Sequence, residues 1–435
     1  MIFLRFVGSV LIIEDDQAKT KQRHRAIEYS SIVENLIQLG SEFTDLAMMA
    51  PVVPKLTSTF EARDYQREAL DAWGNAMFRG IIVLPTGAGK TVLAVKAMEK
   101  LQVSTLIVVP TLVLLEQWRS VLAKAFSVDI GVLGGGENEI KHITVSTYDS
   151  AALRAREIGC KFKLVVFDEV HHLPATSNSK IALNYIAPFR LGLTATLDKN
   201  PETLETLGYL VGSVVYARGV EELAGEHLSD YTVRTINIAL TSDEKLEYDR
   251  QFAVYKGFLK KRGIRIRSAR DYLSFVKRSG RDPEARRALM ARNTAMSIAL
   301  NSRSKEDYLR GILAASPFEK SLIFTRHNKL VYRVSRSLLI PAITHQTGKE
   351  EREEILDRFR SGVYRRIVTS QVLDEGIDVP DASLAVILSG TGSSREFIQR
   401  LGRVLRKKEG KQATLYELVS FGTAETRLSQ RRKET

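Results

Sequence analysis

Residues 81–91 read Ile-Ile-Val-Leu-Pro-Thr-Gly-Ala-Gly-Lys-Thr, and a helical pattern follows as far as Leu101. The first four residues are a short apolar run, which is typical of a buried β-strand. Gly87 and Gly89 permit a loop with exposed backbone N–H groups, and the N-terminus of the next helix favours negative charge. The stretch therefore predicts a strand, a phosphate-binding loop at residues 84–91 and a helix, which together form a unit of a parallel α/β fold.

The loop carries the side chains that a nucleoside triphosphate requires. Lys90 provides a cation for the β- and γ-phosphates, and the Thr91 hydroxyl can ligate Mg²⁺. The general motif G-x-x-x-x-G-K-[ST] begins with Gly, whereas this chain has Leu84 there, so a chance turn is the alternative interpretation. The order of strand, loop and helix favours a site for a nucleoside triphosphate with Mg²⁺, whose loop includes Thr86, Gly87, Ala88 and Gly89.

Asp168 and Glu169 follow a second apolar run at residues 164–167. A carboxylate at a strand end can be aimed at a nucleotide on the carboxyl edge of a parallel sheet. We expect Asp168 to hold the Mg²⁺ shell and Glu169 to orient or deprotonate the attacking water. A zinc site at His171 and His172 is a weaker interpretation, because adjacent residues of an extended segment point in opposite directions and no third ligand is evident.

Two regions alternate apolar runs with helical patterns, which predicts two tandem α/β domains with parallel sheets. The expected strands of the first domain, residues 59–225, are 81–84, 106–109, 164–167 and 191–193. Those of the second domain, residues 226–435, are 321–324, 367–369, 385–388 and 414–418.

A helical insert is expected at about residues 244–300 of the second domain. Between Arg250 and Arg292 there are fourteen Lys or Arg and three Asp or Glu, a net charge of +11 in a chain of net charge +13. An ordinary solvated face mixes both signs, so this excess favours phosphate contact, with Lys260, Lys261, Arg262, Arg265 and Arg267 as candidates. The aromatic residues at helical spacing are expected mostly to form core rather than to stack on bases: Tyr255, Phe258, Tyr272 and Phe275.

The first 58 residues predict a small leading module, in which we find no chemistry. Its apolar residues 2–13 are interrupted by Arg5 and followed by acidic residues, which favours a strand pair over a targeting segment. The chain's basic balance, with a pI of about 9.6, favours nucleic acid or an anionic membrane surface as partner. A single cysteine, Cys160, excludes an internal disulfide framework and favours a buried thiol in a reducing intracellular compartment. No run of residues reaches the length of a membrane span.

The phosphate loop and the acidic pair resemble motifs I and II of superfamily 2 helicases. The other motifs follow in the family's order: Arg63 to Gln66, where Gln66 would read the adenine edge; Thr111 with Gln117 and Trp118; Ser146 to Tyr148; Thr194 to Thr196; Phe324 to Arg326; Ser370 with Asp374 to Asp378; and Gln399 to Arg406. Residues 168–174, 187–196 and 324–328 are similar in particular to the XPB family and its short archaeal members.

The resemblance implies two RecA-like domains, a basic thumb at the helical insert and a damage-recognition domain at the N-terminus. XPB proteins are 3′-to-5′ DNA helicases or duplex translocases of nucleotide excision repair, and eukaryotic members also open promoters. The expected partners are duplex, forked or damaged DNA and, as for archaeal members, a structure-specific nuclease. The expected location is the cytoplasm in a prokaryote or the nucleus in a eukaryote.

The resemblance also assigns roles to single residues. ATP would lie between the two domains, and domain closure would gate hydrolysis. Arg403 and Arg406, three apart on a helix, would act as arginine fingers beside Gln399, with Gly376 and Asp378 near the nucleotide. Strand phosphates would contact Thr111, Thr147, Thr325, Arg326 and Ser370. Coupling between the ATP and DNA sites would run through His171, Thr194 and Thr196.

One feature of the family is absent. The Arg-Glu-Asp loop expected after Thr196 is replaced by Leu-Asp-Lys-Asn-Pro-Glu at residues 197–202, which weakens the case for unwinding more than that for ATP hydrolysis. A duplex translocase with little unwinding and an RNA helicase are therefore alternatives. The intact motifs argue against a non-catalytic module, and no acceptor pocket or carboxylate cluster supports a P-loop kinase or a nuclease subunit.

Overall fold

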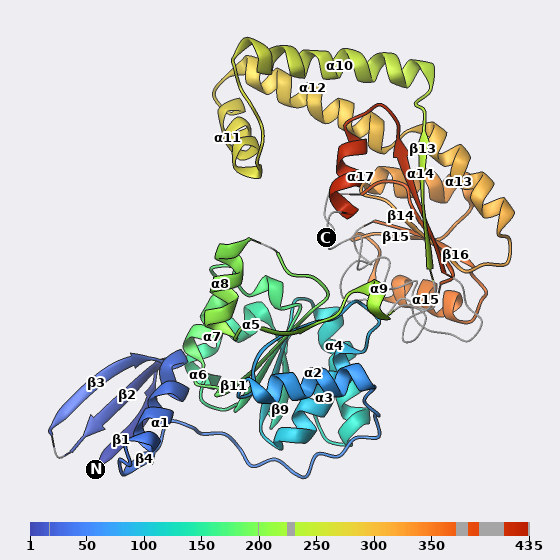
Figure 1. Ribbon diagram of the computed structural model, residues 1–435. Coiled ribbons are helices and arrows are strands. Elements are labelled where there is room, and N and C mark those ends of the chain that lie inside the picture. Colours follow the sequence, from blue (N-terminus) through green and yellow to red (C-terminus); the bar gives the residue numbers. More distant parts are fainter. Residues whose placement is uncertain (17, 199, 224–230, 371–381, 391–412, 434–435) are drawn as a thin grey trace. The chain divides into compact units, whose positions relative to one another are not determined.

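The computed structural model describes the chain except for residues 17, 199, 224–230, 371–381, 391–412 and 434–435 (Figure 1). The described residues up to Leu223 form one compact unit, and those from Tyr231 onward form a second. Five predicted site residues lie outside the described residues: Gly376, Asp378, Gln399, Arg403 and Arg406.

The first large domain is built on an eight-stranded sheet in the order β12-β5-β11-β10-β6-β9-β7-β8. All neighbouring strands are parallel except the hairpin of β7 and β8. The strands are β5 (Arg79–Val83), β6 (Thr105–Val109), β7 (Gly131–Gly134), β8 (Glu137–Glu139), β9 (Ile143–Thr147), β10 (Leu164–Asp168), β11 (Phe189–Thr194) and β12 (Val214–Ala217). The four strands predicted from the sequence are confirmed as β5, β6, β10 and β11, whereas the other four were not predicted.

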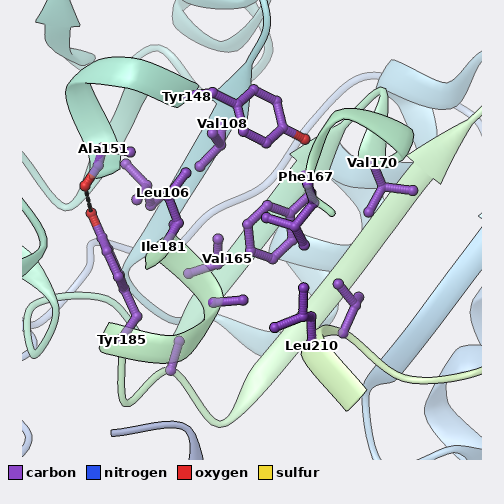
Figure 2. Packing of buried hydrophobic residues seen from close by; sticks show 14 of the residues in the cluster. Leu106, Val108, Tyr148, Ala151, Val165, Phe167, Val170, Ile181, Tyr185 and Leu210 are labelled. Carbon is purple, nitrogen blue, oxygen red and sulfur yellow. Dashed lines mark hydrogen bonds between the residues drawn. The ribbon is translucent and has the colours of Figure 1, made fainter. Parts of the chain in front are cut away.

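Helices cover this sheet (Figure 1). They are α2 (Asp64–Asn75), α3 (Lys90–Leu101), α4 (Leu112–Phe126), α5 (Tyr148–Leu153), α6 (Ala155–Ile158), α7 (Ser179–Asn184) and α8 (Pro201–Leu210), with a 3₁₀ turn, η2 (Val170–His172). A further short helix, α9 (Val220–Leu223), follows β12. Figure 2 shows part of the core between strands and helices, where Leu106, Val165 and Phe167 pack near Tyr185, whose hydroxyl donates to the Ala151 carbonyl at 2.9 Å.

The second domain has a six-stranded parallel sheet in the order β13-β18-β17-β14-β16-β15. Its strands are β13 (Tyr231–Ile238), β14 (Ser321–Phe324), β15 (Ala342–Ile343), β16 (Arg366–Thr369), β17 (Leu384–Ile387) and β18 (Ala413–Ser420). Its helices are α13 (Arg303–Ala315), α14 (Asn328–Leu338), α15 (Lys349–Arg360) and α17 (Glu425–Lys433). The four predicted strands are confirmed, and the two edge strands, β13 and β15, were not predicted.

The helical insert is confirmed as α10 (Ser242–Lys261), α11 (Ala269–Ser279) and α12 (Pro283–Leu300), which we call the thumb. Figure 1 shows α10 and α12 side by side. The thumb begins with a capping box in which the Thr241 hydroxyl accepts from the Glu244 N–H at 3.3 Å. Tyr255, Phe258 and Phe275 are buried in its own core and Tyr272 packs against them, which confirms the predicted core role of these aromatic residues.

The N-terminal module is a four-stranded sheet in the order β3-β2-β1-β4. Its elements are β1 (Ile2–Val7), β2 (Val10–Asp15), β3 (Thr20–Arg25), η1 (Ala26–Glu28), α1 (Tyr29–Gln38) and β4 (Phe43–Asp45), and the predicted strand pair is confirmed as antiparallel β1 and β2. Leu4 and Leu11 pack in one cluster with Cys160 and Ile186 of the first large domain. Cys160 is buried as expected, and burial raises the pKa of its thiol. Among the described residues, no helix is long and apolar enough to cross a membrane.

Candidate functional site

The predicted phosphate loop joins the end of β5 to the start of α3. Gly87 and Gly89 adopt left-handed backbone angles, φ 87° and 76°, which glycine accepts without steric cost. A Cβ atom on Gly89 would lie 2.5 Å from Gln66 Nε2, so a larger residue here would displace the Gln66 amide from its contact with the loop. Lys90 begins the helix, and its Nζ donates to the Leu84 carbonyl at 3.2 Å. The loop therefore has the backbone and the cation that a phosphate site needs.

Gln66 holds the loop from the start of α2. Its Oε1 accepts from the Arg63 backbone N–H at 2.9 Å, and its Nε2 donates to the Ala88 carbonyl at 2.9 Å. The Tyr65 hydroxyl donates to the same carbonyl at 2.7 Å. Gln66 is buried by these contacts. Its proximity to the phosphate loop agrees with the motif, whereas the role of Gln66 and Arg63 at the adenine stays a prediction.

Asp168 is the last residue of β10, and its carboxylate is buried at 6% exposure. Its Oδ2 accepts from Trp118 Nε1 at 2.8 Å and its Oδ1 from the Glu169 N–H at 3.0 Å. The pKa of Asp168 is raised to about 6. Burial of the carboxylate is the larger cause, and the negative charge of Glu169 is the second. A second buried bond, from the Tyr148 hydroxyl to the Asp168 carbonyl at 3.0 Å, fixes the backbone of the same residue.

Replacing Asp168 by asparagine should stabilise the nucleotide-free protein above pH 6. In the folded chain the charged carboxylate is disfavoured, so its raised pKa lowers wild-type stability as pH rises through about 6. Asparagine keeps an acceptor for Trp118 without the charge, so the gain should be on the order of 1–3 kcal/mol at pH 8 and vanish toward pH 4. Thermal melts from pH 4 to pH 8 measure it, with exposed Asp307→Asn as control. A gain that is the same at every pH would contradict this account.

Three adjacent strands bring the site together at their carboxyl ends. In the sheet β11 lies between β5, which leads into the loop, and β10, which leads into the acidic pair. The Leu84 N–H donates to the Thr194 carbonyl at 3.0 Å, which links the loop to the end of β11. The sequence predicted that these segments meet, because carboxyl ends of parallel strands share one edge of the sheet.

The predicted coupling residues are in contact. The Thr194 hydroxyl lies 3.0 Å from His171 Nδ1, 3.3 Å from Glu169 Oε2 and 2.9 Å from the Thr196 carbonyl. Glu169 Oε2 is also 3.4 Å from His171 Nδ1. Glu169 has a left-handed φ of 49°, which is uncommon outside glycine and is concentrated at functional turns. A movement of Thr194 would therefore reach Glu169 directly.

The prediction that His171 and His172 point in opposite directions was wrong. Residues 170–172 form a 3₁₀ turn and not an extended segment, so the rings of His171 and His172 lie on neighbouring sides with centroids 4.3 Å apart. His171 instead contacts Thr194 and Glu169. The described part of the chain contains no group of three or more His, Cys, Asp or Glu side chains suited to a metal ion.

The residues predicted to contact DNA have structural partners of their own. The Thr111 hydroxyl caps α4 and the Thr147 hydroxyl caps α5, at 3.3 and 3.2 Å from backbone N–H groups. Thr325 is fully buried and donates to the His327 carbonyl at 3.2 Å, and Ser370 is buried as well. In the thumb, Lys261 and Arg262 pair with Glu284, whereas Lys260, Arg265 and Arg267 are exposed. Contact of all these residues, and of Arg326, with phosphate stays a prediction.

The residues at this site fit ATP with Mg²⁺. Glycine-rich backbone at a helix N-terminus suits phosphate oxygens. Asp168 and Glu169 place two carboxylates close together, and that of Asp168 is buried. A bound divalent cation would offset the unfavourable burial of this negative charge, which is what raises the pKa of Asp168. Thr91 stands next to Lys90 in the first turn of α3, where its hydroxyl can join that ligand set.

Comparison with known proteins agrees with this geometry. Residues 59–199 match the family described as "Type III restriction enzyme, res subunit", and residues 304–408 match the "Helicase conserved C-terminal domain". The chain is 44% identical to the DNA 3'-5' translocase XPB2 of Sulfurisphaera tokodaii over 100% of both chains. It is 30% identical to the DNA 3'-5' helicase XPB of Mycobacterium tuberculosis, over 83% of this chain and 61% of that protein.

A solved structure shares the fold. The Hef helicase domain of Pyrococcus furiosus superposes with a TM-score of 0.59 at 19% identity, over 86% of this chain and 98% of that one. At this identity the match shows the tandem-domain fold alone. The identity to XPB2 extends over the whole length. The chain therefore belongs to the XPB family of ATP-hydrolysing superfamily 2 DNA helicases and translocases.

Proposed function

We propose that this protein couples ATP hydrolysis to 3′-to-5′ movement along DNA and serves nucleotide excision repair. The observation that carries the proposal is the meeting of Lys90, Asp168, Glu169 and Thr194 at the carboxyl ends of three adjacent strands. The family relation supports DNA as the track, because relatives are named as DNA 3'-5' translocase and DNA 3'-5' helicase.

In this mechanism the first domain binds and activates ATP. Lys90 and the loop N–H groups would bind the β- and γ-phosphates, while Thr91 and Asp168 would hold Mg²⁺, which would neutralise charge on the phosphate oxygens. Glu169 orients the attacking water and accepts its proton. Arg403 and Arg406 supply positive charge to the transition state. Because Thr194 contacts Glu169, a strain on the DNA-contacting motifs that moves Thr194 would change the position of the base.

DNA binding by the thumb is expected to depend on its exposed cations. Replacing Lys260, Arg265 and Arg267 together by glutamine should lower the slope of log affinity against log salt by about 2 to 3, since each phosphate contact contributes about 0.9. Fluorescence anisotropy with a labelled duplex at several salt concentrations measures the slope. The control removes three exposed charges from the first domain, Lys124, Arg156 and Lys180. Equal slopes for the two triple variants would mean that the thumb does not contact phosphate.

Translocation without strand separation is the second candidate function, and the missing Arg-Glu-Asp triplet after Thr196 favours it. The test compares two substrates with ATP: a duplex carrying a triplex-forming third strand, and a forked duplex. A translocase displaces the third strand and leaves the fork paired, whereas a helicase separates both. ATP hydrolysis with neither displacement would contradict movement along DNA.

We also propose a structure-specific nuclease as protein partner, which rests on the resemblance to archaeal XPB proteins. The expected result is a stable complex and faster cleavage at the fork when ATP is present. A nuclease whose cleavage is the same with and without this protein would exclude that candidate.

A further inference from the structure

The root of the thumb, residues 299–305, is tied to the second domain by polar contacts. The Ser420 hydroxyl at the end of β18 donates to the Ala299 carbonyl at 2.7 Å. Glu244 of α10 accepts from the Ser302 hydroxyl at 2.8 Å and from the Arg303 N–H at 2.9 Å. These hydrogen bonds hold α10 at Glu244 and α12 at Ala299, close to the points where the two helices join the rest of the domain.

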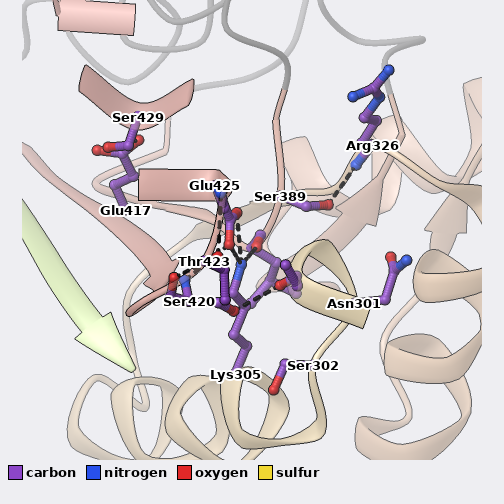
Figure 3. Close-up of polar contacts among 12 residues, drawn as sticks. Asn301, Ser302, Lys305, Arg326, Ser389, Glu417, Ser420, Thr423, Glu425 and Ser429 are labelled. Atoms are coloured by element: carbon purple, nitrogen blue, oxygen red, sulfur yellow. Dashed lines mark hydrogen bonds and ion pairs between the residues drawn. The ribbon is translucent and has the colours of Figure 1, made fainter. Parts of the chain in front are cut away.

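Lys305 lies at the centre of this root (Figure 3). Its Nζ contacts both carboxylate oxygens of Glu425, at 2.7 and 2.6 Å, and donates to the Leu388 carbonyl at 2.8 Å. The two side chains are 1% and 0% exposed. A buried ion pair is often no more stabilising than apolar residues of the same volume, so stability alone is a weak explanation for it. A fixed arrangement of three separate elements is the better explanation: α13, α17 and the end of β17.

The same cluster reaches the loop of residues 325–327, which follows β14 and contains Thr325 and Arg326, both predicted to contact DNA. Leu388, whose carbonyl accepts from Lys305, donates its N–H to the Phe324 carbonyl at 2.9 Å. Ser389, the next residue, accepts from the Arg326 N–H at 2.9 Å through its hydroxyl (Figure 3).

A second hydrogen-bonded contact joins the thumb root to the loop that follows β14. Asn301, the C-cap of α12, lies with its Oδ1 3.2 Å from His327 Nδ1. His327 is the N-cap residue of α14, and burial lowers the pKa of its imidazole. Two routes of hydrogen bonds therefore join the thumb root to one loop.

We propose that Lys305 is a positioning residue that transmits the position of the thumb to the loop 325–327, which is predicted to contact DNA. The proposal rests on the proposed function, because it assumes that the thumb and this loop both meet DNA. Lys305 itself touches neither ATP nor DNA in this account. Its loss should uncouple DNA binding at the thumb from the stimulation of ATP turnover.

The test uses the full chain with Lys305→Met and Glu425→Gln combined. Lys305→Met alone would leave Glu425 buried without its cation, whereas the double variant removes both charges and keeps an acceptor for the Ser420 N–H. We expect basal turnover and the DNA concentration for half-maximal stimulation to stay within about twofold, while maximal DNA-stimulated turnover falls about tenfold. Glu417→Gln is the matched control, since Glu417 is also fully buried in this domain and accepts from the Ser429 hydroxyl at 2.8 Å.

The outcomes separate the two proposals. A wild-type protein that DNA does not stimulate overturns the proposed function, and the positioning role with it. Wild-type stimulation that the double variant fully retains overturns only the role of Lys305. If the double variant does not fold, Asn301→Ala decides through the second route: an expected loss of about threefold in maximal stimulation supports the link, and no loss overturns it.

Discussion

Glu169→Gln should reduce DNA-stimulated ATP turnover by about 100- to 10,000-fold, the range that general-base catalysis contributes. Glutamine has the shape of glutamate and can keep the contact with the Thr194 hydroxyl, but it cannot accept the proton of the attacking water. ATP binding should persist, because Lys90 and the loop backbone are unchanged. Steady-state phosphate release with saturating duplex DNA, together with binding of a fluorescent ATP analogue, measures both quantities.

The control for this variant is Glu116→Gln, which changes an exposed carboxylate on α4 of the same domain. Its turnover should match that of the wild type. If Glu169→Gln kept turnover within threefold of the wild type, roughly 0.7 kcal/mol of barrier, Glu169 would not be the base.

Arg190→Met should destabilise the first unit by on the order of 3–5 kcal/mol. Arg190 lies in β11 at 1% exposure, and its guanidinium donates to three carbonyls, those of Tyr185 at 2.9 Å, Ala187 at 3.2 Å and Leu210 at 2.6 Å. Methionine fills part of the volume but leaves three buried acceptors unsatisfied. The melting temperature should fall by about 10 °C.

Tryptophan fluorescence follows this unfolding selectively, because both tryptophans of the chain, Trp73 and Trp118, are buried in the first unit. Arg119→Met, which removes an exposed ion pair with Glu137, is the matched control and should change stability by less than about 1 kcal/mol. Arg190→Lys should lie between the two, since an ammonium cannot reproduce the planar fork of donors. Wild-type stability in Arg190→Met would show that the three carbonyl contacts contribute nothing.

The central strands were predictable because each is a continuous apolar run between covered faces. Strand β9 escaped prediction because its sequence, Ile-Thr-Val-Ser-Thr, reads as half polar. Thr144 and Ser146 are nevertheless fully buried, since their hydroxyls donate to the carbonyls of Lys141 at 2.8 Å and Leu133 at 3.1 Å. The pattern of apolar residues cannot predict that a buried hydroxyl will find a backbone carbonyl as its hydrogen-bond partner. Strand β15 has only two residues, too few for any pattern.

The candidate site was predictable where a motif places its residues in sequence, as at Lys90 and at Asp168 with Glu169. The sequence did not predict which side chains contact the buried charged groups. Trp118 donates to Asp168 from 50 residues away, and Lys305 meets Glu425 across 120 residues. Only the fold brings such pairs together. A buried lysine and a buried arginine also contradict the usual exposure of these residue types, so composition argued against finding them there.

The most direct test of a DNA-stimulated ATPase is the ATP turnover of the wild-type protein with duplex DNA, single-stranded DNA and RNA, each at saturation. We expect strong stimulation by DNA that is lost in Glu169→Gln, and little stimulation by RNA. Stimulation by RNA alone, or turnover that no nucleic acid changes, would contradict an ATP-driven DNA motor.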